Sequence, residues 1–311
     1  MKKFLNLVMA GIFSVTVLAP NMALAAVAPS KPAGEKLAIV EHMLYGNAQE
    51  GSLIQRMDAI EHDVYGIATG DPVLDRISRM YDYLAGIPSS GEASFTTRLN
   101  VVEWRLKESM SSSPARQRIE EAETLLNGAP GSGAYAIRLE QLLKLTAYAD
   151  GVVPTQVVTL PKDTLLKIAF MDTFGSRDNK VGDKVHFKAV DNLYVNDVLV
   201  LPKGATGIGE IKKIRKPKAF GRDGRVDINF VHIFGIDGTK IPIYVGDLAE
   251  QEAKTVAGAA GVAVGGMILL GPVGAIGGAF VKGKQVEIPA GTVTVVQTGA
   301  DTEIQGAIYQ G

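Results

Sequence analysis

The sequence predicts an α+β protein in which helices and strands occupy separate domains of a 311-residue chain. The first observation is a basic residue that recurs about every 20 positions in the N-terminal half, within the apolar spacing of helices. The second is a C-terminal half of short runs rich in Val, Ile and Thr, separated by Gly and Pro turns. The third is a long uncharged, glycine-rich segment inside that half. The chain has no Cys, which excludes disulfides, thiolate metal sites and a cysteine nucleophile.

The first 25 residues have the three-part pattern of a secretory signal peptide. A basic start precedes a mostly apolar run over residues 4–18, and residues 23–25 form an A-x-A cleavage site. The apolar run is short for a membrane span of ~20 residues. We therefore expect an exported protein of the periplasm or outer membrane of a diderm bacterium, with a mature chain that begins at Ala26 or Val27.

Residues 35–147 form a helical repeat, marked by a basic residue at intervals of 20, 20, 22, 20 and 20. Apolar residues stand three positions before this residue and one, four and eight after it, which places them on one helix face. A Gly ten positions after it, in four repeats, suits the left-handed residue that ends a helix. We expect six helices of ~12 to 14 residues that bury this face against one another. The six basic residues are Lys36, Arg56, Arg76, Arg98, Arg118 and Arg138.

An acidic residue follows the basic one by five positions in four repeats, at Glu41, Glu61, Glu103 and Glu123. We expect the basic residues to pair with acidic residues of adjacent helices rather than to bind a ligand. Residues 31–150 hold 12 basic and 17 acidic residues, a net charge of −5, which argues against nucleic acid. Two roles stay open for the repeat: a spacer or general docking surface, and a binding surface for one specific envelope protein.

Residues 152–311 form the predicted β domain. Strands are expected at 156–160, 164–171, 184–190, 198–201, 207–214, 226–234, 240–245 and 285–297. A turn of the form apolar-Pro-x-x recurs three times, at 160–163, 201–204 and 288–291, because Pro presets its second residue and Gly suits its last. Many short strands with little helix favour a barrel or a sandwich.

The order of these segments resembles the C-terminal β-barrel of the TrbI-like conjugal-transfer family, the outer-membrane core scaffold of type IV secretion. The resemblance extends from Thr159 to Val296 and is carried by turns: VGDK at 181–184, LPKGA at 201–205, DG at 237–238, IPI at 241–243 and IPAGT at 288–292. It implies a helical insertion that enters the outer membrane. In place of the inner-membrane helix and Pro-rich linker typical of such scaffolds, this chain has a cleavable signal and a helical repeat.

The glycine-rich insert, residues 255–281, contains 27 residues without a charge. Strands are expected on both sides of it, and Gly271-Pro272 breaks it near the middle, so we predict a hairpin of two helices, 255–270 and 273–281. Gly261 with Gly265, and Gly274 with Gly278, have the four-residue spacing that lets helices approach closely in lipid. Contact with a membrane is favoured over dry packing on the barrel or an oligomer contact.

One basic cluster is a candidate anion-binding site for lipid phosphates or an anionic wall polymer, although a solvated loop is the favoured interpretation. It consists of Lys212, Lys213, Arg215, Lys216 and Lys218, with Arg222 and Arg225 across a loop. His42 and His62 share one repeat position, where a surface pair is favoured over a metal site. His186 and His232 have no ligand spacing. No catalytic motif is present in the sequence, and no cofactor or metal is expected.

These observations favour a non-enzymatic envelope protein, associated with the outer membrane, that acts as a structural or assembly scaffold. Its partners would be the membrane and other envelope proteins that the repeat contacts. The alternative is a subunit of an oligomeric outer-membrane channel or secretion complex, which makes the protein a candidate homo-oligomer. A wall-active enzyme is the weakest hypothesis, since no nucleophile, metal set or carboxylate pair stands out.

Overall fold

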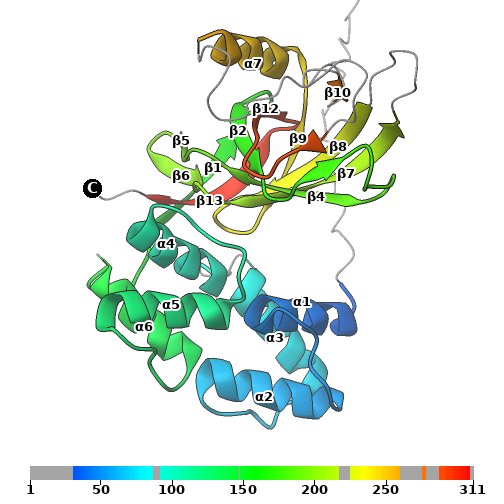
Figure 1. The fold of residues 1–311 in the computed structure, drawn as a ribbon. Coiled ribbons are helices and arrows are strands. Elements are labelled where there is room, and N and C mark those ends of the chain that lie inside the picture. The colour runs from blue at the N-terminus through cyan, green and yellow to red at the C-terminus, as the bar shows by residue number, and fades with distance from the viewer. Residues whose placement is uncertain are drawn as a thin grey trace, which may run out of the picture. The chain divides into compact units, whose positions relative to one another are not determined.

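The computed structural model describes residues 31–86, 92–146, 148–216, 225–259, 275–277 and 287–308. The signal peptide predicted for residues 1–25 lies outside them. Within the described residues, six helices precede the strands (Figure 1): α1 (Ala33–Tyr45), α2 (Leu53–Tyr65), α3 (Val73–Ala85), α4 (Phe95–Lys107), α5 (Ala115–Asn127) and α6 (Tyr135–Leu145).

Each of the first five helices has the same position relative to the basic residue of its repeat. The first five helices have 13 residues each, beginning three positions before the basic residue and ending nine after it. Ser52 caps α2 in a capping box with Gln55, which satisfies free backbone N–H groups. Gly66 and Gly128 end their helices in the left-handed conformation, as predicted. Gly86 is the exception: it is extended, with φ −83°.

The six helices share one core, and helices distant in sequence contact each other. α1 packs against α3 and α5, α2 packs against α3 and α6, and α4 packs against α3, α5 and α6. The repeat therefore folds as one closed bundle rather than an open row. Every residue one or four positions after the basic one is buried, from Leu37 to Leu142. The predicted inward face is wrong at Leu53 and Leu126, which are 36% and 37% exposed at helix ends.

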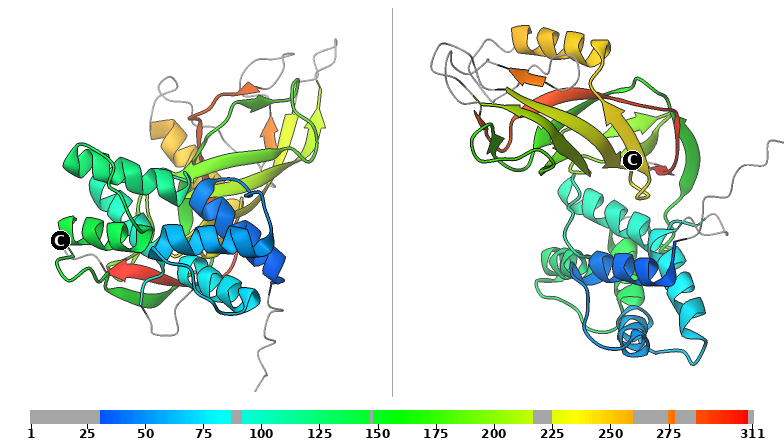
Figure 2. Two further views of the ribbon diagram at one scale, coloured as in Figure 1. Left: turned by 90° about the horizontal axis from the view of Figure 1, so that it is seen from below. Right: turned by 90° about the vertical axis from the view of Figure 1, so that its right-hand side faces the viewer.

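The strands form a closed barrel, which decides between the two architectures predicted. Six strands are hydrogen-bonded in the order β8-β7-β4-β2-β12-β9, and a pairing of β9 with β8 closes the ring (Figure 2). Large side chains such as Phe170, Phe187 and Phe230 fill its core. The strands are β2 (Leu165–Phe170), β4 (Lys184–Ala189), β7 (Thr206–Arg215), β8 (Arg225–Phe234), β9 (Lys240–Tyr244) and β12 (Val293–Thr298).

A second sheet and a short ribbon complete the β region. The second sheet has the order β1-β13-β6-β5 and shares the barrel's apolar core. Seven of the eight predicted runs are confirmed with small shifts, while the run 285–297 is split by the turn at Pro289. Strands β3, β5, β10 (Ala275–Gly277) and β13 were not predicted. The remaining strands are β1 (Thr155–Leu160), β3 (Phe174–Gly175), β5 (Leu193–Val195), β6 (Val198–Leu201), β11 (Glu287–Ile288) and β13 (Thr302–Ile308).

The three Pro turns predicted from the sequence share one backbone feature. Their last residues, Asp163, Gly204 and Gly291, all have a positive φ of 64°, 85° and 84°. Gly adopts this conformation without strain, and Asp tolerates it better than most residues. The turns reverse the chain at the ends of β1, β6 and β11, so the repeated motif marks strand boundaries.

Helix α4 joins the bundle to the β region. The Asn100 amide donates to the Ile236 carbonyl at 2.7 Å, the Trp104 ring N–H donates to Asn192 at 3.1 Å, and Met110 N donates to Lys203 O at 2.9 Å. Leu199 and Ile236 of the β region belong to the same apolar cluster as the bundle core. Residues Ala33–Gly311 form one compact unit. The division into domains at 35–147 and 152–311 remains a prediction about independent folding.

The structure corrects the predicted helical hairpin at residues 255–281. Helix α7 (Asp247–Ala259) begins eight residues earlier than the first predicted arm, because Ala249 and Ala253 pack on Val295 of β12. The second arm is wrong where it is described: β10 (Ala275–Gly277) is a strand that pairs antiparallel with β8. The free backbone groups at that end of β8 provide its partners. The rest of the insert, residues 260–274 and 278–286, lies outside the described residues.

Candidate functional site

The charged residues of the repeat form a ladder of buried ion pairs, as predicted. Each pair joins an arginine to a glutamate 15 residues earlier, on the preceding helix. The pairs are Arg56–Glu41, Arg76–Glu61, Arg118–Glu103 and Arg138–Glu123, with N···O distances of 2.5, 2.9, 2.6 and 2.6 Å. The glutamates are at most 4% exposed. Pairing satisfies charges that would be costly to bury alone.

Three of these glutamates also hold the loop that follows their helix. The backbone N–H eight residues later donates to the carboxylate: Thr69 to Glu61 at 2.7 Å, Ser111 to Glu103 at 2.9 Å, and Gly131 to Glu123 at 2.7 Å. One carboxylate therefore fixes the end of its helix, the loop and the next helix. The polar residues that recur in the repeat serve its architecture.

Burial and pairing shift the pKa values of several residues in the bundle. For Glu123, burial alone would raise the pKa, but hydrogen bonds from Arg138 and the Gly131 N–H outweigh burial and lower it. For Arg118, burial lowers the pKa although Glu103 opposes the shift. For Tyr65, burial raises the pKa to about 12.

The fourth repeat breaks the ladder. Fifteen residues before Arg98 stands Tyr83 in place of a glutamate, and Arg98 Nη2 donates to the Tyr83 hydroxyl at 2.9 Å. Arg98 Nε is buried without a hydrogen-bond partner among the described residues. Sequence reasoning missed this site, although two signals marked it: the 22-residue step, and Tyr81 where other repeats have an acid.

The basic cluster predicted at residues 212–218 lies on β7 where the structure describes it. Lys212, Lys213, Arg215 and Lys216 are exposed, and no ion pair to them is found among the described residues. A register shift between Ile211 and Lys213 marks a bulge beside them. Across the hairpin Arg225 pairs with Asp227 at 2.6 Å, so it is not part of a free cluster. Lys218 and Arg222 lie outside the described residues.

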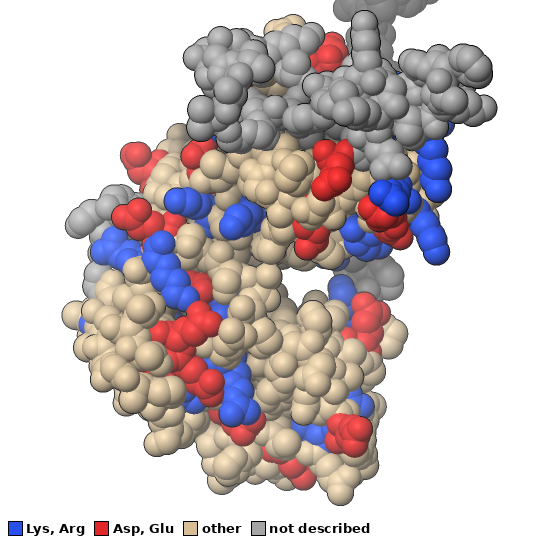
Figure 3. All heavy atoms as spheres, viewed as in Figure 1, with Lys and Arg blue, Asp and Glu red and all other residues tan. Residues whose placement is uncertain are grey.

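Lys and Arg side chains gather at the barrel edge that borders the grey residues in Figure 3. Carboxylates lie among them, and charges of both signs are interspersed elsewhere on this face. The described part of the cluster is thus a set of solvated cations on a strand.

The predicted membrane-contact residues belong to the glycine-rich insert. Gly261, Gly265, Gly271, Pro272, Gly274 and Gly278 all lie outside the described residues. The three described residues between Gly274 and Gly278, Ala275–Gly277, form a strand where a helix was predicted. Among the described helices, none has both the length and the apolar content that a membrane crossing requires.

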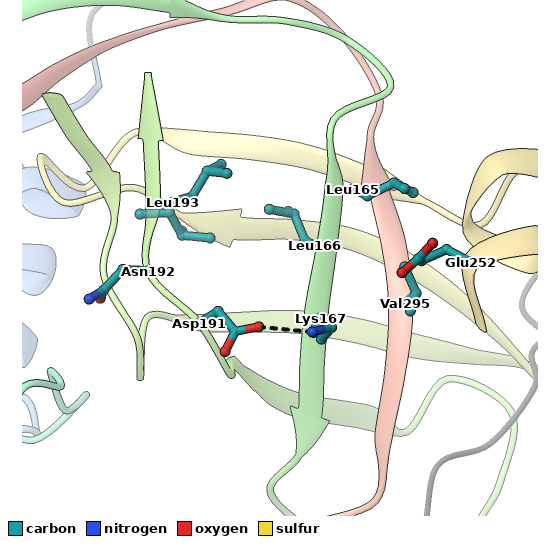
Figure 4. A pocket seen from close by; sticks show the side chains of 9 residues that line it. Leu165, Leu166, Lys167, Asp191, Asn192, Leu193, Glu252 and Val295 are labelled. Atoms are coloured by element: carbon teal, nitrogen blue, oxygen red, sulfur yellow. Dashed lines mark ion pairs between the residues drawn. The ribbon is translucent and has the colours of Figure 1, made fainter. Parts of the chain in front are cut away.

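A small pocket opens beside the barrel, between β2, the segment before β5, and α7 (Figure 4). Its volume is 260 Å³, below the ~300–1,000 Å³ of most ligand sites. Lys167 points toward Asp191 and pairs with it at 3.4 Å. The neighbouring Asn192 accepts hydrogen bonds from Trp104 and from Lys203 N. The pocket wall therefore serves the contact between bundle and barrel.

The histidines do not form a metal centre in the described structure. His42 and His62 are exposed on α1 and α2, and His186 Nδ1 lies 3.0 Å from Asp172 Oδ2. Burial, with a contribution from Lys240, lowers the pKa of His232, whose ring packs edge-on against Phe234. No group of three His, Asp or Glu within the described ranges could hold a metal ion.

No family is shown for this chain by comparison with known proteins. No family model matches the chain, and no curated protein matches its sequence. Among solved structures, the chain is similar to ComB10 of the Com type IV secretion system of Helicobacter pylori. The TM-score is 0.27 and the identity 15%, over 46% of this chain and 88% of that one. A function for this chain therefore has to be argued from its own residues.

Proposed function

We propose that this chain is an exported, non-enzymatic scaffold of the cell envelope, associated with the outer membrane. Its barrel presents the glycine-rich insert to the membrane, and its bundle docks other envelope proteins. The observation that carries this proposal is the attachment of the insert: α7 leaves the barrel after β9, and β10 returns to β8 of the same barrel. A folded barrel thus carries an excursion that contains a 27-residue uncharged run.

The absence of enzymatic activity is part of the proposal, and the ladder supports it. Buried titratable groups often mark active sites. Here the buried carboxylates and guanidinium groups of the bundle are satisfied by each other and by loop N–H groups. This use of charge is typical of an architectural protein.

Flotation of the purified chain with phospholipid vesicles tests the role of the insert. Val264→Asp/Leu270→Asp adds charge to the uncharged run and should release the protein from the vesicles, because carboxylates are costly in an apolar medium. Ile54→Asp/Ile67→Asp is the matched control, since these residues are 56% and 69% exposed on the bundle. The proposal fails if the insert variant still floats like the control.

The alternative is a subunit of an oligomeric channel or secretion complex, which the TrbI-like resemblance implies. Gly261 and Gly265 provide one spacing for close helix contact between copies. Mass measurement in detergent tests this: a ring requires several copies, and Gly265→Leu should dissociate them. A monomer that still binds vesicles would support the scaffold and exclude the channel.

A further inference from the structure

A cavity of 790 Å³ opens where the ladder is broken. It is bounded by the end of α3, the start of α4, one face of α6 and the segment that leads into β1. Its walls include Ala93, Ser94, Ile137 and Val153, and Arg98 and Tyr83 line it together. The volume lies within the ~300–1,000 Å³ typical of ligand sites.

The other repeats show what Arg98 lacks. At four equivalent positions a buried carboxylate faces the arginine, with N···O distances between 2.5 and 2.9 Å. Arg98 has a phenol at the corresponding place, so among the described residues no carboxylate forms an ion pair with it, and Glu140 acts on it only at longer range. Of the residues between α3 and α4, Glu92 alone is acidic, and it is exposed at the mouth of the cavity. Arg98 Nε is buried without a partner among the described residues, as Arg76 Nε is in an intact rung. What sets Arg98 apart is the missing carboxylate, and a charge-assisted bond to a carboxylate from outside would be strong.

The mouth of the cavity carries acidic residues, whose charge is opposite to that of Arg98. Asp82, Glu92, Glu140 and Asp150 line it and are exposed, so they lie at its mouth. Glu140 is paired with Lys144 at 2.6 Å rather than with Arg98. A simple anion would be repelled by this mouth, whereas a ligand with a carboxylate at its centre and cations beside it matches both regions.

We infer that this cavity is a docking site for a peptide segment of a partner protein, in which an acidic side chain reaches Arg98 and flanking Lys or Arg side chains meet the acidic mouth. The bound carboxylate gives Arg98 the charged partner that glutamates give the arginines of the four intact rungs. Ile137 and Val152, each 56% exposed, give the peptide apolar contacts at the same opening. The inference deepens the docking role proposed above and rests on it.

The cavity is held open by hydrogen bonds independent of Arg98. The Gln305 amide donates to the Glu92 carbonyl at 3.3 Å and to Thr155 at 3.0 Å, which ties the start of α4 to β1 and β13. Ser94 caps α4 by accepting from Thr97 N at 3.1 Å. Substitution of Arg98 should therefore leave the walls in place.

The test is a titration of the isotope-labelled full chain, followed by amide chemical shifts, with two probe peptides. N-acetyl-Lys-Glu-Lys-amide supplies the carboxylate, and N-acetyl-Lys-Gln-Lys-amide lacks it. The wild type should bind the first about tenfold or more tightly than the second, as expected of a charge-assisted hydrogen bond. Equal binding of both peptides, or no binding, would overturn the inference.

Three variants assign the effect to Arg98. Arg98→Gln should abolish the preference for the glutamate peptide. Tyr83→Glu restores the missing rung and should also abolish the preference, because it supplies an internal carboxylate to Arg98. If Arg98→Gln does not fold, Tyr83→Glu alone tests whether Arg98 binds the peptide carboxylate. Arg79→Gln is the control, because Arg79 lies on α3 but is 55% exposed and pairs with Asp71. A preference that persists in Arg98→Gln or Tyr83→Glu, or disappears in Arg79→Gln, refutes the site. Vesicle binding plays no part in this readout, so failure of the membrane proposal is distinguishable.

Discussion

The rung between Glu103 and Arg118 should be the most sensitive ion pair of the bundle. Their side chains are 2% and 7% exposed. Glu103 accepts from Arg118, from the backbone N–H and hydroxyl of Ser111 at 2.9 Å each, and from Lys107 at 3.4 Å. Arg118 also donates to Asn100 at 2.7 Å, and Asn100 holds the Ile236 carbonyl. The rung thus supports the contact with the barrel.

Glu103→Gln should lower the free energy of unfolding by about 3 to 5 kcal/mol, the usual cost of leaving one partner of a buried pair uncompensated. The amide keeps one acceptor for the loop, but its NH₂ group turns donors toward the donors of Arg118. Urea unfolding followed by far-ultraviolet circular dichroism measures the loss. The matched control is Asp71→Asn, since the Arg79–Asp71 pair is 55% and 52% exposed and should contribute about 0 to 1 kcal/mol.

A double variant separates the pair from its surroundings. Glu103→Leu/Arg118→Met removes both charges, which is often nearly neutral in a buried site. Asn100 and Ser111 would still lose partners, so we expect a residual loss of about 1 to 3 kcal/mol. The reasoning is refuted if Glu103→Gln falls within ~1 kcal/mol of the exposed control, because the carboxylate would then not be desolvated as its burial implies.

Further predictions test the core, the turns and the pH dependence. Leu99→Asp should cost several kcal/mol in urea unfolding, because Leu99 is 1% exposed, whereas Leu125→Asp, at 61% exposure, should be nearly neutral. Gly204→Ala should destabilise more than Gly291→Ala: both have positive φ, but only at Gly204 would the methyl group overlap Met110 O, and equal melting temperatures would contradict this. The lowered pKa of Glu123 stabilises the fold above its unfolded pKa of about 4.3, and this contribution is lost as pH falls through the lower folded value. Glu123→Gln should therefore flatten the dependence of unfolding free energy on pH below ~5, and an unchanged slope would count against the pair.

The sequence predicted the bundle well because the period of the α-helix determines the positions of both the core residues and the ion pairs. Apolar residues one and four positions after each arginine had to point inward, and the acid at five then had to lie beside that face. The sequence did not predict which helices contact each other. The pairing of α1 with α5 and of α2 with α6 depends on how the whole set closes, and a repeat of nearly equal units carries no signal for closure.

The missed strands have local causes. In β13, Gly306 interrupts the apolar pattern and reads as a strand breaker, yet a side chain there would overlap Val198 and Leu199 of β6. The β5–β6 hairpin turns at Asn196 and Asp197, whose φ values of 50° and 64° lie in the left-handed region that Asn and Asp tolerate. Strand β10 exists because β8 offers a free edge, which no property of residues 275–277 reveals.

The departures from the repeat are informative because the repeat itself fixes the expectation for every position. At Glu108 a non-glycine residue takes the left-handed cap with φ 51°, and the loop that follows delivers Met110 to the Lys203 carbonyl. Asn100 and Trp104 meet the barrel. In the remaining departure, Tyr83 stands where a glutamate precedes the other arginines, and Arg98 bonds to its hydroxyl instead of to a carboxylate. Two of these three irregularities around α4 are explained by contacts within the chain. The third leaves Arg98 without the carboxylate that the other rungs have, and the proposed peptide partner would supply it, which the paired peptides test directly.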